Sequence, residues 1–202
     1  MTKFNVRGSA EQEFEADIFE IRLTLRTEDK DAGESIAKGA KTAEQLLQMF
    51  ADTLHIEPEQ FSMDADSVSR GYQSDGYSRI ICVLLRIPAD LAVLHAVTGL
   101  LESFGNAEYQ LEYLLADPKA ADEAVMRAAF ADSRAKADKL ADLLGVKVTG
   151  ADHVNYEYSG EEEPAMYKCA GLADICSNAL ADRLQKPVIR IQKSVNIAWL
   201  AE

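Results

Sequence analysis

Two segments with a period of two residues constrain this chain more than any other feature. Between Ala16 and Thr27, every second residue from Phe19 to Leu25 is apolar and the residues between them are polar, which is typical of a strand with one buried face. Between Tyr77 and Pro88, both alternating sets are apolar. We expect this second strand to lie centrally in a sheet and to be covered on both sides, and the second cover could be another subunit.

Periodicity and turn residues predict further elements along the chain. Polar residues at Ala10–Glu15 favour a hairpin turn between the first two strands, and Gln73–Gly76 favours a second hairpin. The remaining strands are expected at Phe4–Ser9, Phe61–Tyr72, Glu108–Leu115, Val146–Tyr158 and Val188–Leu200, and the helices at Asp29–Leu54, Asp90–Phe104, Asp117–Leu144 and Leu172–Leu184.

The two long helices carry different apolar stripes. In the first, Asp31 is the expected N-cap, and the stripe comprises Ile36, Ala40, Ala43, Leu47, Phe50 and Leu54. In the other, Asp117 caps the helix and Pro118 opens it. Its expected stripe consists of small residues, which let a helix lie close to a sheet: Ala121, Ala124, Val125, Ala128, Ala131 and Ala135.

This order of elements predicts an α+β fold, in which helices pack on a largely antiparallel sheet. A strand-helix-strand-strand pattern recurs, first over residues 16–88 and then over residues 108–200. We expect a single domain over residues 1–202, with a variable segment at about 159–186 that opens on the acidic run Glu161–Glu163 and is interpreted there as a solvated loop.

The composition excludes several classes of protein. Of the 202 residues, 48% are hydrophobic and 27% are charged, which excludes a disordered chain and allows a sizeable core. A formal net charge of −13 argues against a general nucleic-acid binder, which needs a basic surface. The sequence has no stretch of about 18 apolar residues, so no transmembrane helix is predicted. The odd set of three cysteines and the absence of a visible signal peptide favour a cytoplasmic location.

The negative charge is unevenly distributed. Residues 117–150 hold 6 acidic and 6 basic residues, so the acidic excess lies outside the long helix. Pairs at four-residue spacing, Glu123/Arg127 and Asp132/Lys136, predict a salt-bridged solvent face. The alternative is a basic interaction face, which would comprise Arg127, Arg134, Lys136 and Lys139.

No motif predicts a reaction. His55, His95 and His153 fall in different expected elements and lack a second His or Cys at metal-ligand spacing. The sequence contains no Walker A, dinucleotide-binding or nucleophile-elbow motif. We therefore predict that the protein is not an enzyme, with no catalytic, cofactor-binding or metal-binding residue.

The three cysteines do not predict a site either. Cys82 is interpreted as a small apolar residue in a buried strand. Cys169 and Cys176 would lie about 10 Å apart along one helix, too far for a disulfide, and they lack the Cys-x-x-Cys spacing of zinc or redox sites.

Three segments resemble the SIMPL domain family, which includes bacterial periplasmic and outer-membrane-associated antigens. They are the opening Phe4–Ala10 with the strand that follows Ala16–Ile18, the alanine- and lysine-rich helix Ala128–Gly145, and the last strand from Pro187 to Trp199. The resemblance implies an α+β fold, a tendency to oligomerise and, for some members, a link to envelope or oxidative stress. It implies no catalytic residue.

Three hypotheses for function follow, and the last of them is a hydrolase-like enzyme whose motif is not recognised. The first is a non-enzymatic protein that assembles with itself or binds a protein partner. The alternative is a small-molecule binding module with a pocket between sheet and helices or between subunits. Its polar lining would draw on Tyr72, Tyr77, Tyr109 and Tyr113, which can equally pack within a sheet. The binding residues of the first hypothesis are not identified by the sequence.

Overall fold

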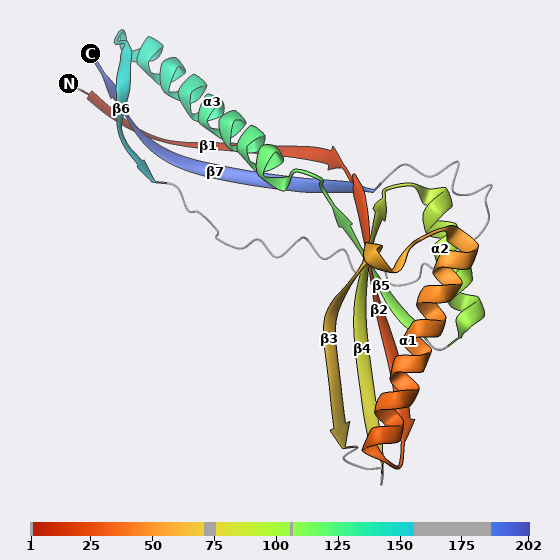
Figure 1. Ribbon diagram of the computed structural model, residues 1–202. Coiled ribbons are helices and arrows are strands. Elements are labelled where there is room, and N and C mark those ends of the chain that lie inside the picture. The colour runs from red at the N-terminus through yellow and green to blue at the C-terminus, as the bar shows by residue number, and fades with distance from the viewer. Residues whose placement is uncertain (1, 71–75, 106, 156–186) are drawn as a thin grey trace. The chain divides into compact units, whose positions relative to one another are not determined.

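The computed structural model describes residues 2–70, 76–105, 107–155 and 187–202, which fall into two compact units (Figure 1). Unit 1 contains the described residues 2–15, 115–155 and 187–202. Unit 2 contains residues 16–70, 76–105 and 107–114. Each unit has its own antiparallel sheet with one or two described α-helices packed on it, so the predicted α+β class is confirmed.

The sheet of unit 2 has four antiparallel strands in the order β3-β4-β2-β5. These are β2 (Ile18–Asp29), β3 (Phe61–Arg70), β4 (Tyr77–Pro88) and β5 (Ala107–Leu114). Helices α1 (Ala32–Leu54) and α2 (Leu91–Phe104) lie on one face of this sheet, and the short 3-10 helix η1 (Pro58–Gln60) leads into β3 (Figure 1).

Alternation in β2 and β4 builds the core of unit 2. Both strands are interior, as predicted for β4, and their helix-facing side chains are buried. Burial of one such side chain stabilises the fold by about 1.5–3 kcal/mol, so these residues together hold α1 and α2 on this face of the sheet. The buried residues are Phe19, Ile21, Leu23 and Leu25 of β2, and Ile81, Val83, Leu85 and Ile87 of β4.

Helix α1 begins at the predicted cap, where Asp31 accepts a hydrogen bond of 3.0 Å from the Glu34 N–H. Its predicted stripe is partly wrong, because the helix buries Ser35, Gly39, Leu46 and Phe50 and leaves Ile36 45% exposed. The cause is Arg79 of β4, which passes under the helix: a Cβ on Gly39 would lie 2.8 Å from Arg79 Cδ. The side of α1 that carries Gly39 therefore faces the sheet, and Ile36 lies away from it.

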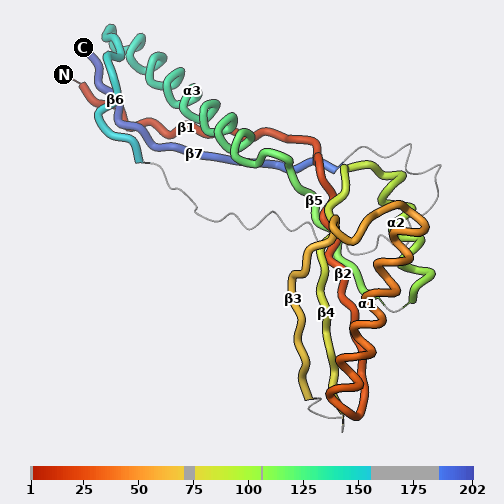
Figure 2. The backbone as a smooth tube through the Cα atoms, viewed as in Figure 1, coloured from red at the N-terminus to blue at the C-terminus, as the bar shows by residue number. Residues whose placement is uncertain are grey.

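The sheet of unit 1 has the order β1-β7-β6, with β1 (Thr2–Glu15), β7 (Val188–Ala201) and β6 (Val148–Asn155). Strands β1 and β7 come from opposite ends of the sequence and run side by side over their full length, from Thr2↔Ala201 to Glu15↔Val188 (Figure 2). The predicted turn at Ala10–Glu15 is wrong, because these residues continue β1 and pair with β7.

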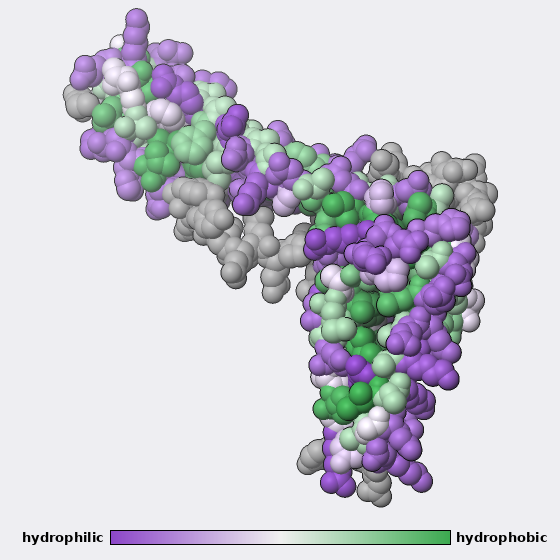
Figure 3. All heavy atoms as spheres, in the orientation of Figure 1, coloured by the Kyte–Doolittle hydropathy of each residue, from purple (hydrophilic) through white to green (hydrophobic). Residues whose placement is uncertain are grey.

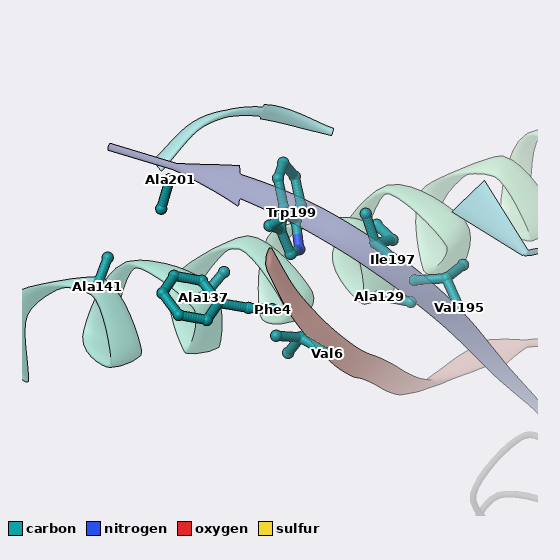
Figure 4. Close-up of a cluster of buried hydrophobic side chains, with 9 residues drawn as sticks. All are labelled: Phe4, Val6, Ala129, Ala137, Ala141, Val195, Ile197, Trp199 and Ala201. Atoms are coloured by element: carbon teal, nitrogen blue, oxygen red, sulfur yellow. The ribbon is translucent and has the colours of Figure 1, made fainter. Parts of the chain in front are cut away.

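Helix α3 (Pro118–Leu144) lies unusually close to the unit 1 sheet. A Cβ on Gly8 would lie 2.1 Å from the Ala129 carbonyl oxygen and 2.7 Å from Ser133 Cβ, so only glycine fits there. The core cluster in Figure 4 shows alanines of α3 facing the larger side chains of β1 and β7. The side chains that α3 buries are Ala121, Val125, Ala129, Ser133, Ala137 and Ala141.

The predicted small-residue stripe is therefore wrong in part, because Ala124, Ala131 and Ala135 are exposed. Alanine occupies several sides of this helix, so its spacing does not specify one face. At the centre of the contact between α3 and the sheet, the buried residue is Ser133 rather than an alanine. Trp199 Nε1 donates to Ser133 Oγ at 3.0 Å, and Ser133 Oγ donates to the Val6 carbonyl at 3.2 Å.

Two side chains of α3 also hold the backbone of β1. The Ser9 N–H donates to Asp132 Oδ2 at 2.9 Å, and Lys136 Nζ donates to the Arg7 carbonyl at 3.2 Å and to Asp132 at 2.6 Å. The Lys136 ammonium, and then the Ser9 N–H, lower the pKa of Asp132. These contacts protect part of a sheet edge from pairing with another strand.

Both units repeat one topology. In unit 2 the elements β2-α1-β3-β4, and in unit 1 the elements β1-α3-β6-β7, place the last strand between the first and the middle one. The predicted second set began at Glu108, but that strand, β5, joins the unit 2 sheet beside β2. Its place in unit 1 is taken by β1. A single domain over residues 1–202 stays a prediction, and the predicted helix Leu172–Leu184 lies outside the described residues.

Candidate interaction surface

The face of the unit 2 sheet opposite α1 and α2, here called the distal face, carries an apolar strip on β4. Because side chains alternate along a strand, Ile80, Cys82 and Leu84 point away from the buried set of this strand. All three are half-buried. Neither described helix packs on this face. The second covering layer expected from the sequence is not supplied by α1 or α2.

Arginines of the neighbouring strands flank the apolar strip. The strand register places Arg22 beside Leu84 and Arg26 beside Ile80, and Arg86 continues the strip on β4. Arg86 Nε lies 2.6 Å from Glu20 Oε2 and Arg26 Nε lies 3.3 Å from Glu28 Oε1.

Arg22 differs from these two pairs. Its Nε lies 3.6 Å from Asp64 Oδ2, and this buried Nε makes no hydrogen bond with any residue the structure describes. A buried donor without a hydrogen-bond partner is energetically costly.

Sequence reasoning missed these arginines, because they occupy ordinary polar positions of an alternating strand. A signal was nevertheless present: strands β2 to β5 contain five arginines and no lysine. Protein interfaces are enriched in arginine and depleted in lysine, and their centres are apolar. The distal face has both properties, with Thr24 and Cys82, 3.7 Å apart between Oγ1 and Sγ, as its neutral middle.

Three cations of α3, Arg127, Arg134 and Lys136, form ion pairs within the helix. Arg134 also lies over the Trp199 ring, with its Cζ 5.1 Å from the ring centroid. Both predicted pairs form, which supports the salt-bridged reading over the basic interaction face. The predicted pairs are Arg127–Glu123 at 3.3 Å and Lys136–Asp132 at 2.6 Å, and Arg134–Asp138 at 3.0 Å is a third pair that was not predicted.

The candidate tyrosines do not form one lining. Tyr109 and Tyr113 lie on the helix-facing side of β5, where Tyr113 packs edge-on against Phe19 with ring centroids 5.6 Å apart. Tyr77 pairs with Asp29 at the other end of the sheet, about 20 Å from Tyr109 along the strands. Tyr72 lies outside the described residues.

The histidines are equally dispersed. His55 ends α1 in a left-handed conformation, His95 is half-buried in α2, and His153 is exposed on β6. Among residues 2–70, 76–105, 107–155 and 187–202, no three His, Cys, Asp or Glu residues gather in a way that could hold a metal ion. Cys169, Cys176 and the run Glu161–Glu163 lie outside these ranges.

Carboxylates with shifted pKa values have structural explanations. At the start of α1, a hydrogen bond with Asp29 raises the pKa of Glu34, and the Lys30 N–H lowers the pKa of Asp29. In β3, hydrogen bonds from Arg79 lower the pKa of Asp66. These groups stabilise a helix start and a strand-to-helix contact.

The sequence model of the SIMPL family, described as a protein of unknown function (DUF541), matches residues 4–199. The chain belongs to the SIMPL family. This match spans described parts of both units. No curated protein matches the chain. Within the described parts of this SIMPL protein, no helix is both long and apolar enough to cross a membrane.

Proposed function

We propose that this SIMPL protein acts by protein association rather than catalysis, and that it assembles with copies of itself through the distal face of unit 2. The apolar strip Ile80, Cys82 and Leu84 carries the proposal, because it lies among arginines on the side of the sheet that α1 and α2 do not cover. Packing a second layer on the strip would remove apolar surface from water, worth about 25 cal/mol per Å².

Net charge predicts how salt affects this assembly. Each copy carries a formal charge of −13, so copies repel one another at low ionic strength. Salt screens this repulsion and leaves apolar contacts intact. Assembly through the distal face should therefore strengthen as salt is raised from about 0.05 M to about 0.5 M.

Sedimentation equilibrium of the full chain tests the proposal. The wild-type chain should sediment as an oligomer at micromolar concentration, and Leu84→Glu should reduce the mass. Leu143→Glu is the matched control, because Leu143 is 83% exposed on α3 in unit 1 and should leave the mass unchanged. Circular dichroism checks that both variants are folded. A strict wild-type monomer at both salt concentrations would refute self-assembly.

A further inference from the structure

An apolar stripe lies between α1 and β3 on the helix-bearing side of unit 2. Met63 is 68% exposed, Ile36 is 45% exposed and Val68 is 41% exposed; these three residues are here called the β3–α1 stripe. Met63 and Val68 pair with Val83 and Arg79, which both belong to the side of the sheet on which α1 lies. Figure 3 shows hydrophobic side chains gathered along this face, over α1, β3 and β4.

Two contacts keep α1 alongside β3 and fix the ends of the stripe. At one end, Arg79, the register partner of Val68, donates to the Ile36 carbonyl. At the other end, the rings of Phe50 and Phe61 meet edge-on, with centroids 5.2 Å apart. Both elements span about 20 Å between these contacts, given about 1.5 Å of rise per helical residue and about 3.3 Å per strand residue. The stripe therefore has the length of a three- to four-turn helix.

The apolar side of α1 is wider than the core requires. Ala40, Ala43 and Leu47 share a side of the helix with Ile36, and none of the three is fully buried. On β3 every residue after Phe61 is exposed. Among the described residues of unit 2, this face therefore has room for a helix beside α1 that neither α1 nor α2 fills.

The surroundings of the stripe are acidic toward its Met63 end, whereas Lys38, Lys41, Arg70 and Arg79 lie near its Ile36–Val68 end. Between Lys41 and Arg70 the sequence has no lysine or arginine but six acidic residues: Glu44, Asp52, Glu57, Glu59, Asp64 and Asp66. This segment forms the second half of α1, η1 and nearly all of β3. Asp66 is paired with Arg79, and Asp64 with Arg22 on the distal face. The other four acids favour a positively charged ligand.

The free edge of β3 is poorly suited to the addition of a strand. Its pairing with β4 shifts register between Met63 and Ala65, which marks a β-bulge. Bulges twist an edge strand and interrupt the regular row of backbone donors and acceptors that a new strand would need. A helix that packs on side chains does not need backbone hydrogen bonds from the edge strand.

We propose that the β3–α1 stripe binds a basic amphipathic helix of a partner protein, with apolar side chains on the stripe and Lys or Arg facing the acidic rim. A second copy of this chain fits poorly, because it carries a net charge of −13. The site lies on the opposite side of the sheet from the distal face. It is therefore independent of self-assembly, and the two respond to salt in opposite directions.

Fluorescence polarisation tests the proposal with a labelled leucine–lysine amphipathic helix of about 14 residues, which matches the length of the stripe. The peptide should bind the full chain, and the double variant Met63→Ser/Val68→Ser should weaken binding about tenfold or more. Glu59→Gln should weaken it less, and about 0.5 M salt should weaken it for every variant. Because the substituted residues are exposed, the variants should fold normally.

Two controls separate this site from general attraction to an acidic protein. Leu143→Ser removes an even more exposed apolar side chain, in unit 1, and should leave peptide affinity unchanged. A leucine–glutamate helix of equal length should not bind. Equal affinity of wild type and Met63→Ser/Val68→Ser, equal weakening by Leu143→Ser, or absence of binding would each overturn the proposal.

Discussion

Gly8→Ala should destabilise unit 1 severely. A Cβ at this position would lie 2.1 Å from the Ala129 carbonyl oxygen, whereas carbon and oxygen atoms normally approach to about 3.3 Å. Strand and helix would have to separate by about 1 Å. Such overpacking costs about 1–3 kcal/mol.

The separation would also strain the contacts of Ser133. The two hydrogen bonds that Ser133 makes, with Trp199 and with Val6, are each worth about 1 kcal/mol. Alanine recovers about 0.4–1 kcal/mol by restricting the unfolded chain. The expected net loss in the free energy of unfolding is about 2–4 kcal/mol.

Urea unfolding followed by tryptophan fluorescence measures this loss. Trp199 is the only tryptophan of the chain and lies in the affected core, so the signal reports on unit 1. With a typical m-value, the midpoint should fall by about 1–2 M. Gly150→Ala is the matched control in the same unit, because a Cβ there meets nothing within 4 Å. An unchanged midpoint for Gly8→Ala would refute the close-approach argument.

Two further predictions concern ion pairs. Hydrogen bonds from Arg79 lower the pKa of Asp66 below its unfolded value near 3.9, so the pair stabilises above that pH and the stabilisation is lost as pH falls through the folded pKa. Asp66→Asn should therefore lower the melting temperature near neutral pH, and the difference from wild type should shrink as pH falls through the folded pKa of Asp66. A difference that does not change with pH would contradict this. Lys193, whose side chain is only 9% exposed, pairs with Asp122 at 2.5 Å. Asp122→Ala should lower the free energy of unfolding in urea more than Lys193→Met does, because only the first removes an ion-pair partner from a buried ammonium.

Local periodicity predicted the elements well but not their partners. The alternation in β2 and β4 specifies which side chains face the helices, so the unit 2 core followed from the sequence. The pairing of β1 with β7 could not be predicted from the sequence. The two strands come from opposite ends of the chain, and no local pattern indicates that they are neighbours. The tight contact at Gly8 was equally hidden, since it depends on which face of α3 meets the strand.

The candidate surfaces were predictable only in part. The second apolar set of β4 was visible in the sequence, and the distal face follows from it. The β3–α1 stripe was not, because Ile36 was expected in the core. It is exposed instead, since Arg79 occupies the space beneath Gly39 and the helix turns accordingly.

The pairing of β1 with β7 also has a consequence for synthesis. Among the described elements β1 leaves the ribosome first and β7 last, so β1 waits while roughly 170 residues are added, about 9–35 s at ordinary rates of translation. During that time its backbone is available to the strands of unit 2 as they emerge. Lys3, Arg7, Glu11 and Glu13 lie on one exposed side of β1, and charged side chains on a strand disfavour its pairing with a wrong strand during this interval.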